Sequence, residues 1–154
     1  MIDQPQIVQS PRQQTAAIHV TVPRDGIMQA FPPAVHELVA ALGAQGIKPS
    51  GPLLSYHLKV PTDVFDFEIA FPVDREVKPE GRVFASEVPA MTVARSIYRG
   101  PMEGLGSAWG ELCNWMSENK HTTRSILWES YLVGPDSTPD PAKWQTQLNW
   151  PITA

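Results

Sequence analysis

The stretch Ile126-Leu127-Trp128-Glu129-Ser130-Tyr131-Leu132 predicts a β-strand with a carboxylate at its centre. Alternation along a strand places Leu127, Glu129 and Tyr131 on one face and the residues between them on the other. Ionised carboxylates are rarely buried without a partner, because burial disfavours the charged form. Glu129 therefore needs a partner, and we expect that partner to be a ligand. The alternative is a structural glutamate that hydrogen-bonds the backbone or the nearby Tyr131.

The composition is that of a globular protein of 154 residues, which suits one domain or two small halves that share a core. The net charge is −4 and there is no Lys/Arg-rich run, so we expect no direct nucleic-acid binding. The N-terminus lacks the basic and apolar regions of a signal peptide, and no apolar run reaches membrane-spanning length. We therefore expect a soluble, cytoplasmic protein without a membrane partner.

Enzyme and metal signatures are few. Cys113 is the single cysteine, which excludes an internal disulfide and zinc-type spacing, and the four histidines show no pair spacing suited to a metal. Gly104-Leu105-Gly106-Ser107 has neither the order of a nucleophile elbow nor the spacing of a dinucleotide loop. We expect neither a metal nor a cofactor. His57 is interpreted as a structural or surface histidine.

The first half of the chain predicts the order β-α-β-β over about residues 5–74. Strands are expected at 13–22, 53–58 and 64–71. The helix between the first two has a buried stripe of Val35, Leu38, Val39 and Leu42. Its start is expected at Pro32-Pro33 and its end at Gly43 or Gly46.

The second half repeats this order over about residues 81–153, within one domain that spans residues 1–154. Strands are expected at 91–98, 125–133 and 145–150. The stripe of the second helix consists of Leu105, Ala108, Trp109, Leu112 and Met116.

The closing strands agree in detail, since 67–73 and 146–152 share their alternation and an aromatic-Pro-aliphatic end. Phe67, Phe71 and Trp150 on these strands are expected in the core. Aligning the halves places Tyr56 with Tyr131 and Leu54 with Glu129. On that alignment the fold accepts an apolar residue where Glu129 stands, so the carboxylate is not an architectural requirement.

Short motifs in a fixed order over both halves resemble the GyrI-like small-molecule-binding domain, also called the AraC-type effector-binding domain. The motifs are Gly51-Pro52, Ser55-Tyr56, Phe65-Asp66-Phe67-Glu68, Phe71-Pro72-Val73, Tyr98-Arg99-Gly100-Pro101, Leu105, Trp109, Glu129-Ser130-Tyr131, Pro135, Trp144-Gln145-Thr146 and Trp150-Pro151-Ile152. The resemblance covers nearly the whole chain. It implies two β-α-β-β units related by a pseudo-twofold axis, which form a curved antiparallel sheet with two helices and a ligand cleft near the axis.

The resemblance also implies a role for Glu129, because drug-sensing members have a glutamate at this position that faces lipophilic cations. Tyr131 and Tyr56 match aromatic positions around that pocket, and Trp109 is a further candidate wall. The glycines around Trp109 leave the helix surface without side chains there, which would allow close approach of a neighbouring element or a ligand. Family members often have a DNA-binding segment before this domain. In this sequence the domain begins within the first few residues, so we expect a stand-alone member.

The expected function is binding of amphipathic, cationic aromatic drugs or xenobiotics in an aromatic cleft with Glu129 at its centre. One alternative is a hydrolase of cyclopropane-containing electrophiles, since some stand-alone relatives have this activity. Glu129 would then act as a base, and Tyr131 or Tyr56 would orient the water or polarise the substrate. A third alternative is a protein-binding module that resembles a gyrase inhibitor.

Overall fold

The computed structural model describes residues 2–135 and 137–153, which form two α-helices and antiparallel strands in an α+β fold. This fold class is the one that the sequence predicts. Backbone contacts divide the chain into two compact units. One unit is Pro11–Ala90, and the other combines the residues up to Ser10 with those from Met91 onward. The domain and repeat bounds given above stay predictions.

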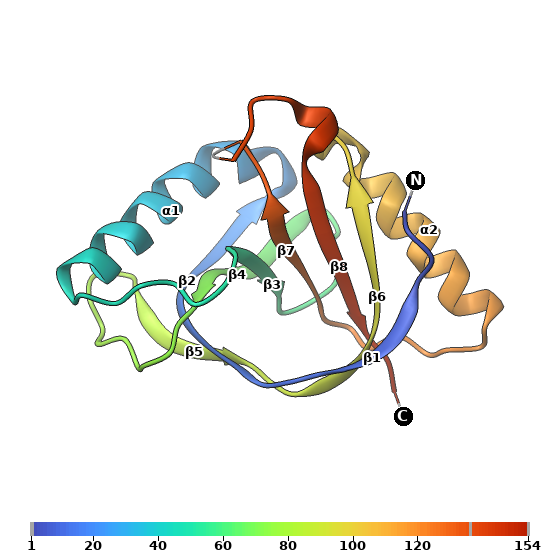
Figure 1. Ribbon diagram of the computed structural model, residues 1–154, viewed down its shortest axis with the longest axis horizontal. Helices are drawn as coiled ribbons and strands as arrows, with labels where there is room; N and C mark the ends of the chain where they lie inside the picture. The colour runs from blue at the N-terminus through green and yellow to red at the C-terminus, as the bar shows by residue number, and fades with distance from the viewer. Residues whose placement is uncertain (1, 136, 154) are drawn as a thin grey trace. The chain divides into compact units, whose positions relative to one another are not determined.

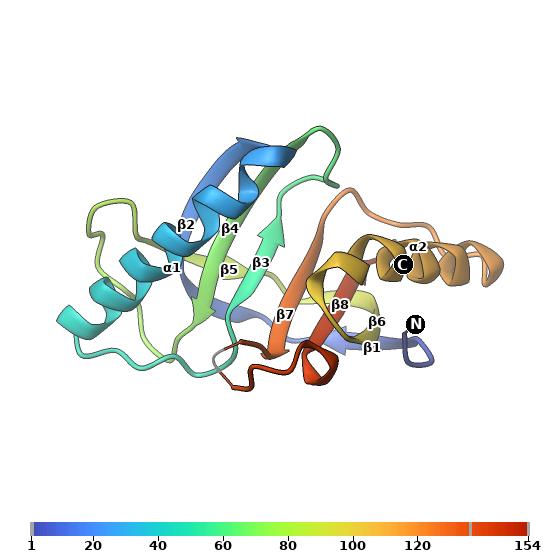
Figure 2. The same cartoon turned by 90° about the horizontal axis from the view of Figure 1, so that it is seen from above.

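The unit Pro11–Ala90 packs one helix on one face of its strands. Its elements are β2 (Gln13–Pro23), η1 (Arg24–Gly26), α1 (Ile27–Ala44), β3 (Leu54–His57), β4 (Val64–Pro72) and β5 (Phe84–Val88). The strands lie in the antiparallel order β3-β4-β2-β5, and α1 lies along β2 and β4 (Figures 1 and 2). Because residues alternate along β2, the side of Ile18 and Val20 packs in the core with Leu38 of α1. The other face of β2 therefore carries His19 and Thr21.

Helix α1 differs from the prediction at its start and along its stripe. It begins at Ile27, so Pro32 and Pro33 lie inside it. The two prolines remove backbone donors that would bond the carbonyls of residues 28 and 29, and both of these residues are exposed to solvent. The buried stripe is Ala34, Leu38, Ala41 and Leu42, whereas Val39 is 55% exposed. The prediction that Val39 is buried is therefore wrong.

The other unit has the elements β1 (Gln6–Ser10), β6 (Met91–Arg99), η2 (Met102–Gly104), α2 (Leu105–Glu118), β7 (Leu127–Val133), η3 (Pro141–Lys143) and β8 (Gln145–Pro151). Its strands lie in the antiparallel order β1-β6-β8-β7, and α2 contacts β6. Three stripe residues of α2 are buried as predicted, namely Ala108, Leu112 and Met116. Strands β1 and β5 were not among the predicted elements. In the described part of the chain, neither α-helix has the length and apolar character needed to cross a bilayer.

Both units contain a strand, a 3-10 turn, a helix and two strands in the same order. A duplication stays an interpretation of this shared order. The pairings allow a comparison of the strand that follows each helix: Leu54 pairs with Ala70, and Trp128 pairs with Asn149. Because Ala70 and Asn149 are equivalent in the closing strands, Leu54 matches Trp128.

This register corrects the predicted alignment by one residue. Glu129 matches Ser55, and Tyr56 does not match Tyr131. The alternation of apolar and polar residues does not by itself determine the pairing register, because the register also depends on the turns that connect the strands. The equivalent position still carries no carboxylate.

Candidate functional site

Glu129 lies in the middle of β7, opposite Leu148 of β8, and its side chain is partly buried. Its two carboxylate oxygens each accept one hydrogen bond. The hydroxyl of Tyr131 donates to Oε1 at 2.8 Å, and the indole Nε1 of Trp109 donates to Oε2 at 2.6 Å. A bulge follows directly, since the pairing register shifts between Tyr131 and Val133. Alternation thus places Glu129 and Tyr131 on one face, and α2 supplies the second donor.

A second indole supports Trp109. The ring of Trp150 on β8 lies edge-on to that of Trp109, with centroids 5.6 Å apart and planes at 79°. The Nε1 of Trp150 donates to the carbonyl of Arg124 at 3.0 Å, which fixes its ring. Edge-to-face contact is a favourable arrangement for aromatic pairs. The indole that binds Glu129 is therefore held by packing as well as by its hydrogen bond.

The charge of Glu129 is not balanced by a cation. Burial raises the pKa of this carboxyl, and the hydrogen bonds from Trp109 and Tyr131 oppose the rise without cancelling it. Both donors are neutral, and no ion pair in the described part of the chain includes Glu129. The site therefore combines an incompletely compensated carboxylate with two aromatic side chains.

Three of the four predicted site residues meet in one unit. Glu129, Tyr131 and Trp109 are in direct contact, whereas Tyr56 lies on β3 of the unit Pro11–Ala90, where it is 8% exposed. A role for Tyr56 beside Glu129 stays a prediction. Sequence analysis missed the indole hydrogen bond and the contact with Trp150. The contact with Trp150 could have been predicted from strand alternation. Leu148 pairs with Glu129, and Trp150, two residues further along β8, lies on the same face as Leu148.

The glycines near Trp109 have different surroundings from those expected. A side chain at Gly104 would overlap the hydroxyl of Tyr98 and approach its Cζ to 2.8 Å, whereas Gly106 and Gly110 face open space. The hydroxyl of Tyr98 donates to the carbonyl of Pro101 at 2.8 Å, so the ring is fixed there. Only Gly104 therefore serves a close contact, and its neighbour is Tyr98.

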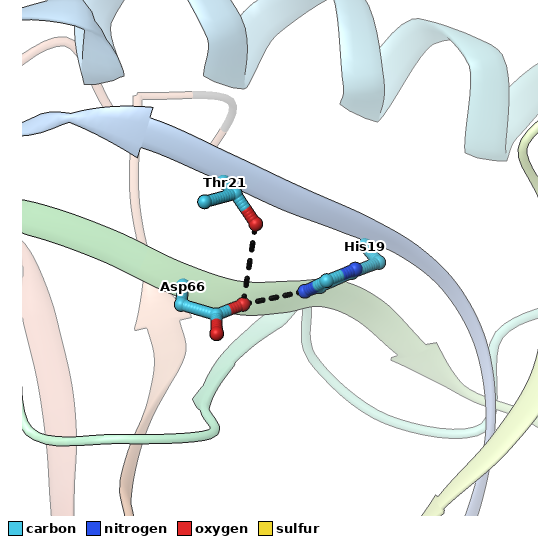
Figure 3. Close-up of polar contacts among 3 residues, drawn as sticks. All are labelled: His19, Thr21 and Asp66. Carbon is cyan, nitrogen blue, oxygen red and sulfur yellow. Dashed lines mark hydrogen bonds and ion pairs between the residues drawn. The ribbon is translucent and has the colours of Figure 1, made fainter.

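Polar groups also collect on the face of β2 and β4 that points away from α1. His19 Nε2 lies 2.5 Å from Asp66 Oδ1, and Thr21 Oγ1 donates to the same oxygen at 3.3 Å (Figure 3). The hydrogen bond with His19 is the main cause that lowers the pKa of Asp66. Glu68 occupies the same face, since it is two residues from Asp66 on β4. Sequence analysis recognised the alternation of β4 without identifying this cluster.

His57 on β3 is buried, so of the two interpretations given above it is a structural histidine and not a surface one. It is 7% exposed, its ring stacks on Phe67 at 5.0 Å, and its Nδ1 has no hydrogen-bond partner among the described residues. Burial lowers the pKa of His57 to about 4. Across residues 2–135 and 137–153, no three His, Cys, Asp or Glu side chains are grouped to hold a metal ion.

The sequence profile of the GyrI-like small molecule binding domain matches residues 3–153. The chain belongs to this family. It is therefore a small-molecule-binding domain. Comparison with curated proteins gave no match.

Solved structures share the fold of this GyrI-like domain. The C-terminal domain of EcmrR is 25% identical, with a TM-score of 0.86 and coverage of 99% of each chain. EcmrR in a DNA complex is 24% identical with a TM-score of 0.83, where 97% of this chain spans 57% of that chain. SAV2435 bound to tetraphenylphosphonium is 13% identical with a TM-score of 0.72, and coverage is 99% of this chain and 95% of that chain.

Proposed function

We propose that this domain binds amphipathic aromatic cations, with Glu129 as the charge partner. The observation that carries the proposal is a partly buried carboxylate whose two hydrogen-bond donors are both neutral. A cation would replace the hydration that Glu129 loses on burial. Contact of the cation with the face of Trp109 or Tyr131 would add about 0.5 to 2 kcal/mol.

The chemistry of a bound relative supports this ligand class. Tetraphenylphosphonium, which SAV2435 binds, is a lipophilic aromatic cation whose charge carries no hydrogen-bond donor. Such a ligand suits a carboxylate that already accepts one hydrogen bond at each oxygen. We therefore expect recognition by charge and aromatic contact, with little demand on the exact shape of the ligand.

The test compares Glu129→Gln with the wild type for tetraphenylphosphonium and for neutral triphenylphosphine oxide, through quenching of tryptophan fluorescence. The substitution keeps the shape of the side chain and removes its charge. We expect affinity for the phosphonium to fall at least about tenfold, since interactions with a charged group contribute on the order of 1.5 to 3 kcal/mol. Affinity for the neutral compound should change by less than about twofold.

The matched control is Glu118→Gln, which removes the same charge from an exposed position of α2. It should leave both ligands unaffected. An equal loss for both ligands in Glu129→Gln would identify Glu129 as a structural residue. The hydrogen bond from Tyr131 is compatible with that outcome, so the comparison of the two ligands separates the interpretations.

A hydrolase remains the second candidate because the same geometry suits a general base. The raised pKa of Glu129 brings it nearer to neutrality, and the hydroxyl of Tyr131 is 2.8 Å from its Oε1. An electrophilic cyclopropane compound incubated with far less than one equivalent of protein would be converted only by an enzyme. Chromatography should show product in the wild type and none in Glu129→Gln, whereas an intact compound in both would reject this candidate.

A further inference from the structure

Glu68 is a second partly buried carboxylate, and no ion pair among the described residues includes it. It is partly buried on β4, and burial raises its pKa although the hydrogen bond from Ser86 and the charge of His19 oppose the rise. The hydroxyl of Ser86 on β5 donates to its Oε1 at 2.7 Å. In the described part of the chain, Oε2 accepts no hydrogen bond. Glu68 thus has one satisfied oxygen and one open oxygen.

The neighbours of Glu68 come from both adjacent strands. Tyr56 on β3 pairs directly opposite it, and His19 on β2 pairs on its other side. His19 directs its Nε2 to Asp66 (Figure 3), and the hydrogen bond recorded for Glu68 among the described residues comes from Ser86. Residues that pair directly across a sheet point to the same side. An aromatic ring therefore lies beside a carboxylate that has room for another donor.

Thr15 provides an independent sign that a polar partner is missing on this face. Thr15 lies on the same face of β2 as His19. It pairs directly opposite Ser86, whose hydroxyl donates a hydrogen bond to Glu68. Thr15 is 1% exposed, and its Oγ1 has no hydrogen-bond partner among the described residues. An unsatisfied buried hydroxyl is unfavourable, and such groups are rare in folded proteins. A ligand with hydrogen-bond donors would satisfy it.

We propose that Glu68, Ser86 and Thr15, with the ring of Tyr56, form a binding site for protonated primary or secondary amines within the unit Pro11–Ala90. The N–H groups of an ammonium match the open oxygen of Glu68 and the hydroxyl of Thr15. A quaternary or phosphonium cation has no such donors. The two carboxylates therefore differ in open acceptor capacity, because each oxygen of Glu129 already accepts a hydrogen bond whereas one oxygen of Glu68 accepts none from the described residues.

The test uses a matched pair of cations, 2-naphthylmethylammonium and its N,N,N-trimethyl analogue, in calorimetric titrations at about pH 7. Glu68→Gln keeps an oxygen that accepts from Ser86 and removes the charge. It should weaken the primary amine at least about tenfold and leave the trimethyl compound within about twofold. Glu129→Gln should weaken the trimethyl compound at least about tenfold, which Glu68→Gln should not do, so the failure of one site is distinguishable from the failure of the other.

Thr15→Val tests the buried hydroxyl by two readouts of opposite sign. It removes an unsatisfied polar group from the free protein, so the melting temperature should rise, while affinity for the primary amine falls several-fold. The control Glu87→Gln removes a charge from the same strand as Ser86, where Glu87 pairs with Arg12 at 3.1 Å. The proposal is overturned if Glu68→Gln leaves the primary amine unchanged, if it weakens both cations equally, or if Glu87→Gln causes the same loss.

Discussion

The pKa of Glu129 depends on two donors that oppose the effect of burial. Trp109→Phe keeps an aromatic ring beside Trp150 and removes the indole N–H that binds Oε2. The pKa of Glu129 should therefore rise further, and binding of a phosphonium cation should need a higher pH. A carbon NMR titration of the labelled carboxyl measures the change. Trp115→Phe on the same helix is the control, and an unchanged pKa in Trp109→Phe would show that the indole hydrogen bond is absent in solution.

His57 should make stability depend on pH below neutrality. Its pKa falls from 6.5 to about 4 on burial, so between these values the unfolded chain binds the proton and the folded chain does not. The free energy of unfolding should therefore decrease as pH falls through this window, by up to about 1.4 kcal/mol per pH unit. Urea unfolding at a series of pH values measures this slope.

The replacement His57→Phe should remove this part of the slope, because a phenyl ring can stack on Phe67 and does not titrate. It should increase stability near pH 5 relative to the wild type by about 2 kcal/mol. His36→Gln changes an exposed histidine of α1 and is the control. A slope that persists unchanged in His57→Phe would contradict the assignment.

At the level of single residues, sequence predicts a site where one residue conflicts with its surroundings. Glu129 is such a residue, because a charge stands between apolar neighbours on a strand. The donor from Trp109 depends on how α2 lies against β7, which strand alternation does not determine. The position of Tyr56 relative to Tyr131 was shifted because a single-residue slip keeps both segments plausible as strands.

The turn between β6 and α2 offers a test of close packing within one element. Gly104→Ala would place a methyl group against the ring of Tyr98, which is 6% exposed and bonded to the carbonyl of Pro101. We expect a loss of about 1 to 3 kcal/mol in the free energy of unfolding, as for overpacking elsewhere.

The matched control is Gly106→Ala, two residues further along. Gly106 faces open space inside α2, so alanine should stabilise the helix by about 0.5 to 1 kcal/mol. Thermal unfolding of both variants gives the comparison. If both substitutions shift stability in the same direction, the contact between Gly104 and Tyr98 does not constrain the turn.

At the level of elements, the helix stripes were predictable to different degrees. Ala108, Leu112 and Met116 follow the helical period and are buried. Val39 follows the same rule in α1 and is exposed, because the helix buries its alanines, Ala34 and Ala41, against the strands. Strand β1 exposes Gln6, Ile7 and Gln9, so its sequence lacks the alternation of apolar and polar residues that indicates a strand.

At the level of the whole molecule, the order of short motifs over both halves predicted the family, which the profile match over residues 3–153 confirms. No single motif is specific, and the agreement comes from their spacing along the chain. The class of ligand depends on a different kind of information. The two proposed ligand classes are argued from which oxygens of Glu129 and Glu68 are already bonded, and only side-chain positions reveal that.

Ligand binding should couple to the stability of the whole domain in a pH-dependent way. Because burial raises the pKa of Glu129 above its ordinary value of 4.5, this carboxyl ionises at higher pH in the folded protein than in the unfolded chain. Ionisation therefore opposes folding slightly as pH rises through this window, and a bound cation reverses that effect by preferring the ionised form.

A ligand at 100 times its dissociation constant stabilises the folded state by about 2.7 kcal/mol. The shift in melting temperature produced by a fixed concentration of tetraphenylphosphonium should thus grow as pH rises above the ordinary Glu pKa of 4.5. In Glu129→Gln the shift should be smaller and independent of pH, and neutral triphenylphosphine oxide should give a constant shift in both proteins. If the phosphonium shift in the wild type were constant or fell with rising pH, the charge of Glu129 would not contribute to binding.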